Sequence, residues 1–278
     1  MKTKPTQYAV RSLNSIGIQP DIIVARSTRP IDEPRKRKLS VFCNISERDV
    51  ISAPDITSIY EIPVNFEKDK ISERIIEKLA LKPRGSDMRE WRTLVRRIRT
   101  PKKDLSIGIV GKYFNTGDFT LADSYISVIE AVKHAAWRVN RTPTITWLNA
   151  ERYEGDTKRL QELKKFDGII IPGGFGGRGV EGKIKTIAYV RKNNIPFLGL
   201  CYGLQLAVIE YARNICNLRR AHTTEVEPKT KYPVIHTLPE QLANIQEKRM
   251  GGSMRLGAYT CELFPKTRAY DAYGIKLI

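Results

Sequence analysis

A glycine-flanked cysteine between an apolar run and a helical pattern constrains this chain more than any other feature. Residues 196–200 are apolar and predict a short buried strand, while apolar residues recur at helical spacing over 204–211. Between the two lies Gly199-x-Cys201-x-Gly203. A strand that turns so sharply into a helix leaves room only for glycine on either side of the central residue. The pattern predicts a nucleophile elbow, with the Cys201 sulfur at a helix N-terminus, where the helix dipole favours a thiolate.

A buried structural cysteine is the alternative interpretation of Cys201, since free cysteine is often found inside proteins. Glycines at both flanking positions are much less common by chance, and they favour a catalytic cysteine. The other three cysteines, at 43, 216 and 261, form no C-x-x-C pair and show no regular spacing. The sequence therefore predicts neither a zinc site nor a disulfide framework, and it fits a reducing, cytoplasmic location.

The 278 residues suggest two domains, and the net charge of +18 is strongly basic. Much of this charge lies in two clusters, at 35–38 and 89–103. A helical stripe of apolar residues accompanies the second cluster, so we expect a solvated helix face, or one that lies on an acidic neighbouring surface. Nucleic-acid binding is disfavoured, because neither aromatic interleaving nor zinc spacing accompanies the charge. No apolar run is long enough to span a bilayer, and the N-terminus has no apolar signal core.

Strands and helices alternate along the chain, most regularly from residue 105 onward. Helices are expected at 5–16, 34–42, 71–81, 88–99, 123–138, 156–165 and 183–193, and strands at 21–26, 49–52, 106–110, 144–148, 166–171, 196–200 and near 259–263; residues 226–235 resemble edge strands. Such alternation predicts an α/β fold with mainly parallel sheet and right-handed crossovers. Functional sites in these sheets collect at the carboxyl ends of strands, where Cys201 and the glycines of 172–182 both fall.

A cysteine that attacks a carbonyl also needs donors for the oxyanion that forms. The turn at 172–176 is rich in glycine and follows a strand predicted to run parallel to that of Cys201, so its backbone N–H groups are candidate donors. The N–H of Tyr202 is the natural second donor. A phosphate loop is the alternative for these glycines, but the G-x-x-x-x-G-K-[ST] order is absent.

The third requirement is a base, and the chain has three histidines, His134, His222 and His236. His134 falls inside a predicted helix, and His236 alternates as a surface strand residue. His222 is the best local candidate, but a loop position is the favoured interpretation because nothing in the spacing orients it. The residues alone indicate a nucleophile and an oxyanion site without a convincing base.

Four segments together resemble the class I (triad) glutamine amidotransferase domain of the CTP synthase family: Gly199-Leu-Cys-Tyr-Gly-Leu-Gln205, Pro172-Gly-Gly-Phe-Gly176, Thr224-Glu225 and Gly251-Gly-Ser-Met-Arg-Leu-Gly257. Lys2-Thr-Lys-Pro-Thr-Gln7 and Ser15–Asp21 are similar to the later part of the synthetase domain of the same family. The resemblance implies a partial P-loop-type amidoligase domain at 1–83, a basic linker helix at 84–104, and a flavodoxin-like amidotransferase domain at 105–278.

The resemblance also implies a reaction, in which glutamine is hydrolysed and the ammonia converts UTP, activated by ATP with Mg²⁺, into CTP. GTP would activate the glutaminase, and family members are homo-tetramers. Cys201 would be the nucleophile, and Gly174, Tyr202, Gly203, Leu204, Gln205 and Glu225 would border the glutamine site. Lys2, Thr3, Lys4, Pro5, Thr6, Gln7 and Lys38 would contact UTP or inhibitory CTP. Pro54, Asp55 and Ile56 fall where the family contacts the adenine of ATP.

The chain departs from the family pattern at both ends. The family's P-loop, with its Mg²⁺-binding acids, belongs upstream of Lys2, and the His-Pro-Glu segment that completes the triad belongs beyond Ile278. We therefore expect a central fragment that neither forms CTP nor hydrolyses glutamine at useful rates. The open alternatives are a non-catalytic module that binds nucleotide or pairs with full-length subunits, and another α/β hydrolase with a cysteine elbow. In the latter, histidine commonly follows the cysteine, whereas Tyr202 stands here, and residues 2–7 disfavour other amidotransferases such as GMP synthetase.

Overall fold

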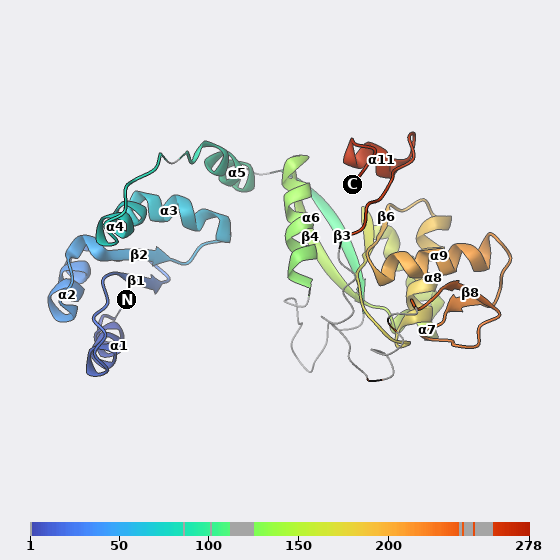
Figure 1. Cartoon of the computed structure of the whole chain (residues 1–278), viewed down its shortest axis with the longest axis horizontal. Coiled ribbons are helices and arrows are strands. Elements are labelled where there is room, and N and C mark those ends of the chain that lie inside the picture. The colour runs from blue at the N-terminus through green and yellow to red at the C-terminus, as the bar shows by residue number, and fades with distance from the viewer. Residues whose placement is uncertain are drawn as a thin grey trace. The chain divides into compact units, whose positions relative to one another are not determined.

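The computed structural model describes residues 2–85, 87–100, 102–111, 125–238, 241, 247 and 258–278. The chain divides into two compact units (Figure 1). The first unit contains Met1–Leu105 and Ile129–Thr144, and the second contains Ser106–Val128 and Ile145–Ile278. The boundary between the two units crosses α6 (Ile126–Arg138) near its start. Its first residues belong to the second unit, and its residues from Ile129 onward belong to the first.

The first unit is built around two parallel strands, β1 (Ile23–Ser27) and β2 (Val50–Pro54). Ile23 pairs with Val50 and Ser27 with Pro54, so the two carboxyl ends lie side by side. The surrounding helices are α1 (Lys4–Ser15), α2 (Glu33–Cys43), α3 (Ile62–Lys68), α4 (Ile71–Lys78) and α5 (Arg89–Arg99), with short 3-10 turns η1 (Glu47–Asp49) and η2 (Ile59–Glu61). Buried apolar side chains of β1, β2, α1 and α2 form one core, which Ile31 joins.

Local sequence explains where these helices begin and end. The Asp32 side chain accepts a hydrogen bond from the backbone N–H of Arg35 and caps α2, and Asn44 ends this helix in the left-handed conformation. The predicted helices of this unit are present within a few residues of their expected bounds, except that α4 ends at Lys78 rather than 81. Helix α3 was not predicted, because its seven residues are too few to display a helical period.

The basic helix α5 lies partly against carboxylates. A guanidinium nitrogen of Arg92 lies 2.5 Å from a carboxylate oxygen of Glu67, and Arg99 lies equally close to Glu61. Opposite charges at this distance attract each other. The attraction is stronger in the pair of Arg99 and Glu61, because Glu61 is buried and less screened by water. These two contacts agree with the interpretation of α5 as a helix on an acidic neighbouring surface.

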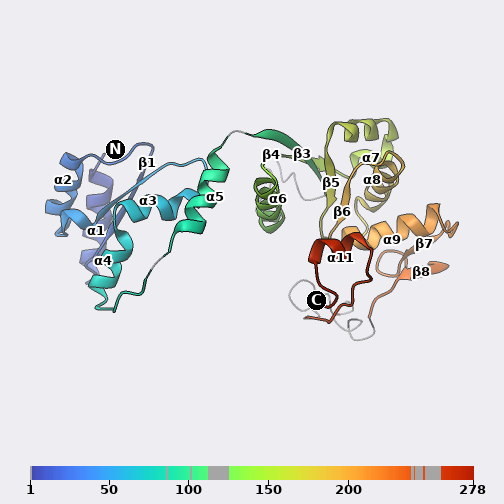
Figure 2. The ribbon, with the colours of Figure 1, turned by 90° about the horizontal axis from the view of Figure 1, so that it is seen from above.

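In the second unit, the described residues form a four-stranded sheet in the order β4-β3-β5-β6 (Figure 2). The strands are β3 (Lys103–Gly111), β4 (Arg141–Asn149), β5 (Gly168–Ile171) and β6 (Phe197–Gly199). Strand β5 is parallel to both β3 and β6, as the alternation predicted. Helices α8 (Val180–Lys192) and α9 (Tyr202–Asn214) contribute to the core that covers β5.

The polar helix expected at 156–165 is present as a 3-10 helix, η4 (Thr157–Lys165), preceded by the short α7 (Arg152–Gly155). Two other local expectations for this unit were wrong. The strand expected near 259–263 is reduced to an isolated antiparallel bridge between Glu262 and Leu277. Val226 lies in a turn between β7 (Ala221–Thr223) and β8 (Tyr232–Ile235), which pair in parallel. The last described helix is α11 (Arg268–Tyr273).

Two sequence features fall outside the described residues. The start of the helix expected at 123–138 and the segment 251–257 belong to this group, so the structure places neither of them. Within the described ranges, no helix combines the length and the hydropathy that crossing a membrane requires.

Candidate active site at the ends of β5 and β6

Cys201 lies at the junction between β6 and α9, as the elbow pattern predicted. Ile171, the last residue of β5, pairs with Gly199, and its carbonyl accepts a hydrogen bond from the N–H of Leu200 at 2.9 Å. Cys201 then adopts φ 51° and ψ −109°, and α9 begins at the next residue. This backbone conformation is rare for any residue other than glycine. The thiol is exposed at the strand end rather than buried, so the structural-cysteine interpretation does not fit.

The two flanking glycines are required by close backbone packing. A Cβ atom on Gly203 would lie 2.0 Å from the carbonyl oxygen of Ile171, and one on Gly199 would lie 2.6 Å from the backbone of Gly203. Such separations are far inside van der Waals contact, so any side chain at either position would force the strand and the helix apart. The elbow therefore depends on glycine at both positions.

The glycine loop that follows β5 faces the cysteine. A Cβ atom on Gly173 would lie 3.4 Å from the Cβ atom and 3.7 Å from the sulfur of Cys201, which is ordinary contact. The hydroxyl of Tyr125 donates to the carbonyl oxygen of Gly173 at 3.5 Å. The loop and the elbow thus meet at the carboxyl edge of adjacent parallel strands.

Glu225 joins the same cluster from a distant part of the chain. Its carboxylate accepts a hydrogen bond from the N–H of Gly176 at 2.8 Å, and the Tyr202 hydroxyl donates to the Gly176 carbonyl at 3.0 Å. Burial, with the nearby Glu225 charge, raises the pKa of Tyr202 well above its ordinary value, so the phenol stays protonated and remains a donor. Glu225 itself is exposed, so its carboxylate remains accessible to a ligand.

The remaining residues expected at the glutamine site differ in how far they are exposed to solvent. Gly203 and Tyr202 are buried, whereas the Leu204 side chain is exposed and Gln205 is half-buried. The N–H of Gln205 donates to the carbonyl of Cys201 as part of the first turn of α9. The structure therefore brings Cys201, Tyr202, the glycine loop and Glu225 together.

Lys183 is a neighbour of this cluster that the sequence analysis missed. It lies in α8, it is 1% exposed, and its ammonium lies 5.4 Å from the centre of the Tyr202 ring. A signal was available, because Lys183 shares one helical face with the apolar residues Val180 and Ile187. A lysine in register with an apolar stripe is unusual and indicates a buried charge with a specific partner.

The residues expected to bind a pyrimidine nucleotide gather on α1 and α2. Residues 2–7 form the first turn of α1 and the residues before it, and Lys38 lies exposed on α2, which packs against α1. Thr3 is buried and accepts a hydrogen bond from the Gln7 side chain at 3.3 Å. The neighbouring cations Arg35, Lys36 and Arg37 each form an ion pair with a carboxylate. Among the described residues no carboxylate pairs with Lys38, so its ammonium is available to a phosphate.

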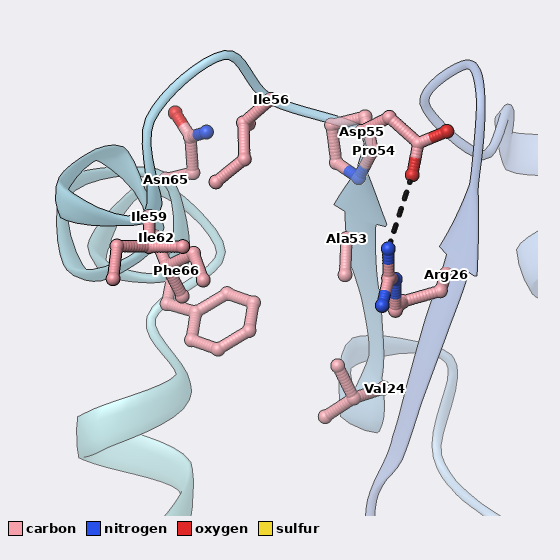
Figure 3. A pocket seen from close by; sticks show the side chains of 10 residues that line it. All are labelled: Val24, Arg26, Ala53, Pro54, Asp55, Ile56, Ile59, Ile62, Asn65 and Phe66. Atoms are coloured by element: carbon pink, nitrogen blue, oxygen red, sulfur yellow. Dashed lines mark hydrogen bonds and ion pairs between the residues drawn. The ribbon is translucent and has the colours of Figure 1, made fainter. Parts of the chain in front are cut away.

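A cavity of about 480 Å³ lies at the carboxyl ends of β1 and β2. Pro54, Asp55 and Ile56, which the resemblance assigns to the adenine of ATP, are among its lining residues, and Asp55 pairs with Arg26 at 3.4 Å. Figure 3 shows side chains of η2 and α3 on one side of this cavity and those of β1 and β2 on the other. The sequence analysis missed the lining residues Val24, Arg26, Ala53, Ile59, Ile62, Asn65 and Phe66.

Comparison with known proteins identifies the family. The model of the CTP synthase N-terminus matches residues 1–81, and that of class-I glutamine amidotransferases matches residues 120–273. The second match covers more than half of the chain. The chain belongs to the class-I glutamine amidotransferase family, and the curated relatives that it matches are CTP synthases.

Curated relatives and a solved structure support this placement within the amidotransferase family. CTP synthase from Microcystis aeruginosa is 48% identical over 278 residues, which are 100% of this chain and 49% of that protein. The enzyme from Methanocaldococcus jannaschii is 47% identical over 99% of this chain and 51% of its own length. The chain thus spans about half the length of these relatives. The solved glutaminase domain of Trypanosoma brucei CTPS with bound acivicin is 26% identical, with a TM-score of 0.51, and covers 62% of this chain and 64% of its own.

All three histidines of this amidotransferase chain lie within its described residues, and none bonds to Cys201. His134 Nε2 lies 2.5 Å from the Tyr60 hydroxyl, and His236 Nδ1 lies 2.7 Å from the Thr237 carbonyl oxygen. His222 belongs to β7, where burial and then the charge of Arg213 lower its pKa. Its Nδ1 accepts from a backbone N–H and its Nε2 faces Glu181 at 3.8 Å. His222 is therefore oriented by its own neighbours and not by the cysteine.

Proposed function

We propose that the second unit hydrolyses glutamine at Cys201, and that the chain belongs to a CTP synthase that aminates UTP with the ammonia released. The observation that carries this proposal is the strained elbow, which presents an exposed thiol beside a glycine loop whose N–H group also holds Glu225. Hydrolysis of an amino-acid amide needs a thiol, backbone donors for the oxyanion and a group for the substrate ammonium, and it needs a base in addition. The first three are present here.

In the proposed reaction, the Cys201 sulfur forms a bond to the side-chain amide carbon of glutamine. The carbon–nitrogen bond then breaks, ammonia leaves with an added proton, and a thioester remains. Water hydrolyses this thioester to glutamate and regenerates the thiol. Backbone N–H groups of the loop around Gly174, together with that of Tyr202, would stabilise the oxyanion in both steps. Gly203, Leu204 and Gln205 would border the substrate, and the exposed Glu225 carboxylate would bind its ammonium group.

The first unit supplies the proposed nucleotide sites. Lys38 and residues 2–7 would contact UTP or CTP, with the lysines acting as point charges for the phosphates. The apolar cavity beside Pro54, Asp55 and Ile56 would hold the adenine of ATP. ATP would phosphorylate the uracil oxygen O4, and ammonia would displace that phosphate to give CTP. Activation by GTP, homo-tetramer formation and a cytoplasmic location are further parts of this proposal, taken from the family.

The fit of a metal ion to this chain is poor. Within the described residues, no group of three or more His, Cys, Asp or Glu side chains could hold Mg²⁺. No step of the mechanism is therefore assigned to metal ligands of this chain.

The test is covalent labelling by 6-diazo-5-oxo-L-norleucine, a glutamine analogue whose diazo group leaves as N₂ when a thiol adds. Peptide mass spectrometry is expected to find the label on Cys201 and to lose it in Cys201→Ser. Glu225→Gln should slow labelling roughly 10- to 100-fold, since a bond to the substrate ammonium loses its charge assistance. Glu227→Gln, an exposed neighbour, is the matched control. Label on Cys43, Cys216 or Cys261 instead, or equal rates in the two glutamine variants, would contradict the proposal.

Steady-state turnover of glutamine should be slow in the same preparation, because no imidazole of the chain bonds to Cys201. Fast ammonia release that disappears in His222→Ala would show that His222 serves as the base, contrary to its position beside Glu181.

A further inference from the structure

Lys183 is a buried lysine of α8. Its side chain is 1% exposed and lies in register with Val180, Ile184 and Ile187, which belong to the apolar core. An ammonium removed from water costs several kcal/mol unless other groups compensate for the loss of hydration. If only volume mattered here, leucine or methionine would fill the position more favourably. The charge therefore needs a specific reason.

The lysine ammonium reaches both parts of the candidate site. It lies 5.4 Å from the centre of the Tyr202 ring and 3.9 Å from the position that a Cβ atom on Gly174 would occupy. A cation near an aromatic face is attracted by the ring quadrupole, more strongly where water is excluded. Lys183 thus lies beside the first residue of α9 and beside the glycine loop that follows β5.

Tyr202 extends this contact across the loop. Its hydroxyl donates to the carbonyl of Gly176, whose N–H in turn donates to Glu225. At the other end of the loop, Gly173 lies beside Cys201, because a Cβ atom added to it would come within 3.7 Å of the sulfur. A loop with three glycines among four residues has large conformational freedom, so fixed contacts at its ends are needed to hold its N–H groups in one direction.

We propose that Lys183 is a positioning residue of the glutaminase centre, which holds the Tyr202 ring and the loop 173–176 in the arrangement that receives an oxyanion beside Cys201. This inference rests on the proposed glutamine hydrolysis. Lys183 acts through Tyr202 and the loop and does not touch the substrate. Its removal should therefore impair reaction with a substrate-like electrophile more than it alters the intrinsic reactivity of the thiol.

The experiment compares two alkylating agents on the full chain. 6-diazo-5-oxo-L-norleucine must occupy the glutamine site, whereas iodoacetamide needs only an accessible thiol. In Lys183→Met, an apolar variant of similar length, labelling of Cys201 by the glutamine analogue should slow at least tenfold while the iodoacetamide rate changes less than threefold. Lys183→Arg keeps the charge and should restore most of the analogue rate. Lys192→Met, an exposed position on the same helix, is the control and should react like the unchanged chain.

Hydrogen exchange of residues 172–179 gives a second readout that requires no glutamine chemistry. Faster exchange of this segment in Lys183→Met, with unchanged exchange in the rest of α8, supports the proposal. If circular dichroism shows that Lys183→Met does not fold, Lys183→Gln replaces it. Unchanged analogue labelling and unchanged loop exchange in the neutral variant would overturn the role of Lys183 and leave glutamine hydrolysis intact. Failure of the analogue to label the unchanged chain, while iodoacetamide does, would overturn the glutaminase proposal and this inference with it.

Discussion

The ends of β1 and β2 and the ends of β5 and β6 are both carboxyl edges of parallel strands, but they are built in opposite ways. At β5 and β6 the strand and the following helix meet backbone to backbone, with glycines at 199 and 203. At β1 and β2 the strand ends open into a cavity of about 480 Å³ lined by side chains. The same strand topology therefore holds the Cys201 sulfur in a fixed position in the second unit and leaves space for a ligand in the first.

The difference predicts where each region tolerates substitution. A backbone contact leaves no room for adjustment, so a single added methyl group should disrupt the elbow. A cavity lined by side chains can lose one wall residue and still fold, so its substitutions should alter binding more than stability.

The largest expected effect is that of Gly203→Ala. The added carbon would lie 2.0 Å from the carbonyl oxygen of Ile171, and neither backbone segment can yield without breaking the sheet or α9. We expect a loss of roughly 3 kcal/mol or more in the free energy of unfolding of the second unit, measured by urea denaturation. Gly155→Ala is the control, because no atom lies within 4 Å of its added carbon. Equal stability of the two variants would mean that the elbow is not tightly packed.

A smaller effect is expected at the cavity. Phe66→Ala removes an aromatic wall beside Pro54 and Ile56, so stacking with an adenine base would be lost. Affinity for ATP, measured by calorimetry, should fall about tenfold, in line with the usual value of one stacked base. Phe264→Ala, at an exposed aromatic residue outside the cavity, should leave binding unchanged. If Phe66→Ala binds ATP as the unchanged chain does, the adenine does not occupy this cavity.

The smallest effect concerns the ion pair beside this cavity. Mainly through its hydrogen bond, Arg99 lowers the pKa of Glu61, which is 6% exposed. Because the folded-state pKa lies below the ordinary value of 4.5, the stabilisation is complete above about pH 4.5 and is lost as the pH falls through the folded-state pKa. Arg99→Met should cost about 0.5–1 kcal/mol at pH 7, since the arginine is half exposed, and almost nothing at low pH.

Arg97→Met is the matched control for this pair. Arg97 is exposed on the same helix, and among the described residues no carboxylate pairs with it. Urea denaturation at several pH values should show a pH-dependent difference only for Arg99→Met. A difference that persists unchanged at low pH would assign the effect to lost packing rather than to charge.

The two regions also differ in how well the sequence predicted them. The elbow could be predicted because Gly199 and Gly203 are local requirements that are visible in the residue types themselves. The strands were predicted from apolar runs between turn residues, and β1, β2, β5 and β6 all lie where they were expected.

The cavity was predicted only in part, because its far wall belongs to a helix that the sequence pattern did not reveal. Pro54 and Ile56 follow a predicted strand, whereas Asn65 and Phe66 lie on α3, which is too short to show a period. Lys183 was missed although its register with an apolar stripe indicates burial, and its position beside Tyr202 is visible only in the tertiary structure. The segment near 259–263 was wrongly predicted as a strand because local residue types do not reveal whether a partner strand is available.

The left-handed conformation of Cys201 has a consequence for any attempt to improve this chain. A side chain held at φ 51° and ψ −109° costs on the order of 1–3 kcal/mol, which glycine would largely recover. At position 201, the residue that gives the more stable fold is therefore not the residue that supplies the reactive thiol. A laboratory selection that rewarded folding alone, with no demand on chemistry, would enrich glycine there and discard the sulfur.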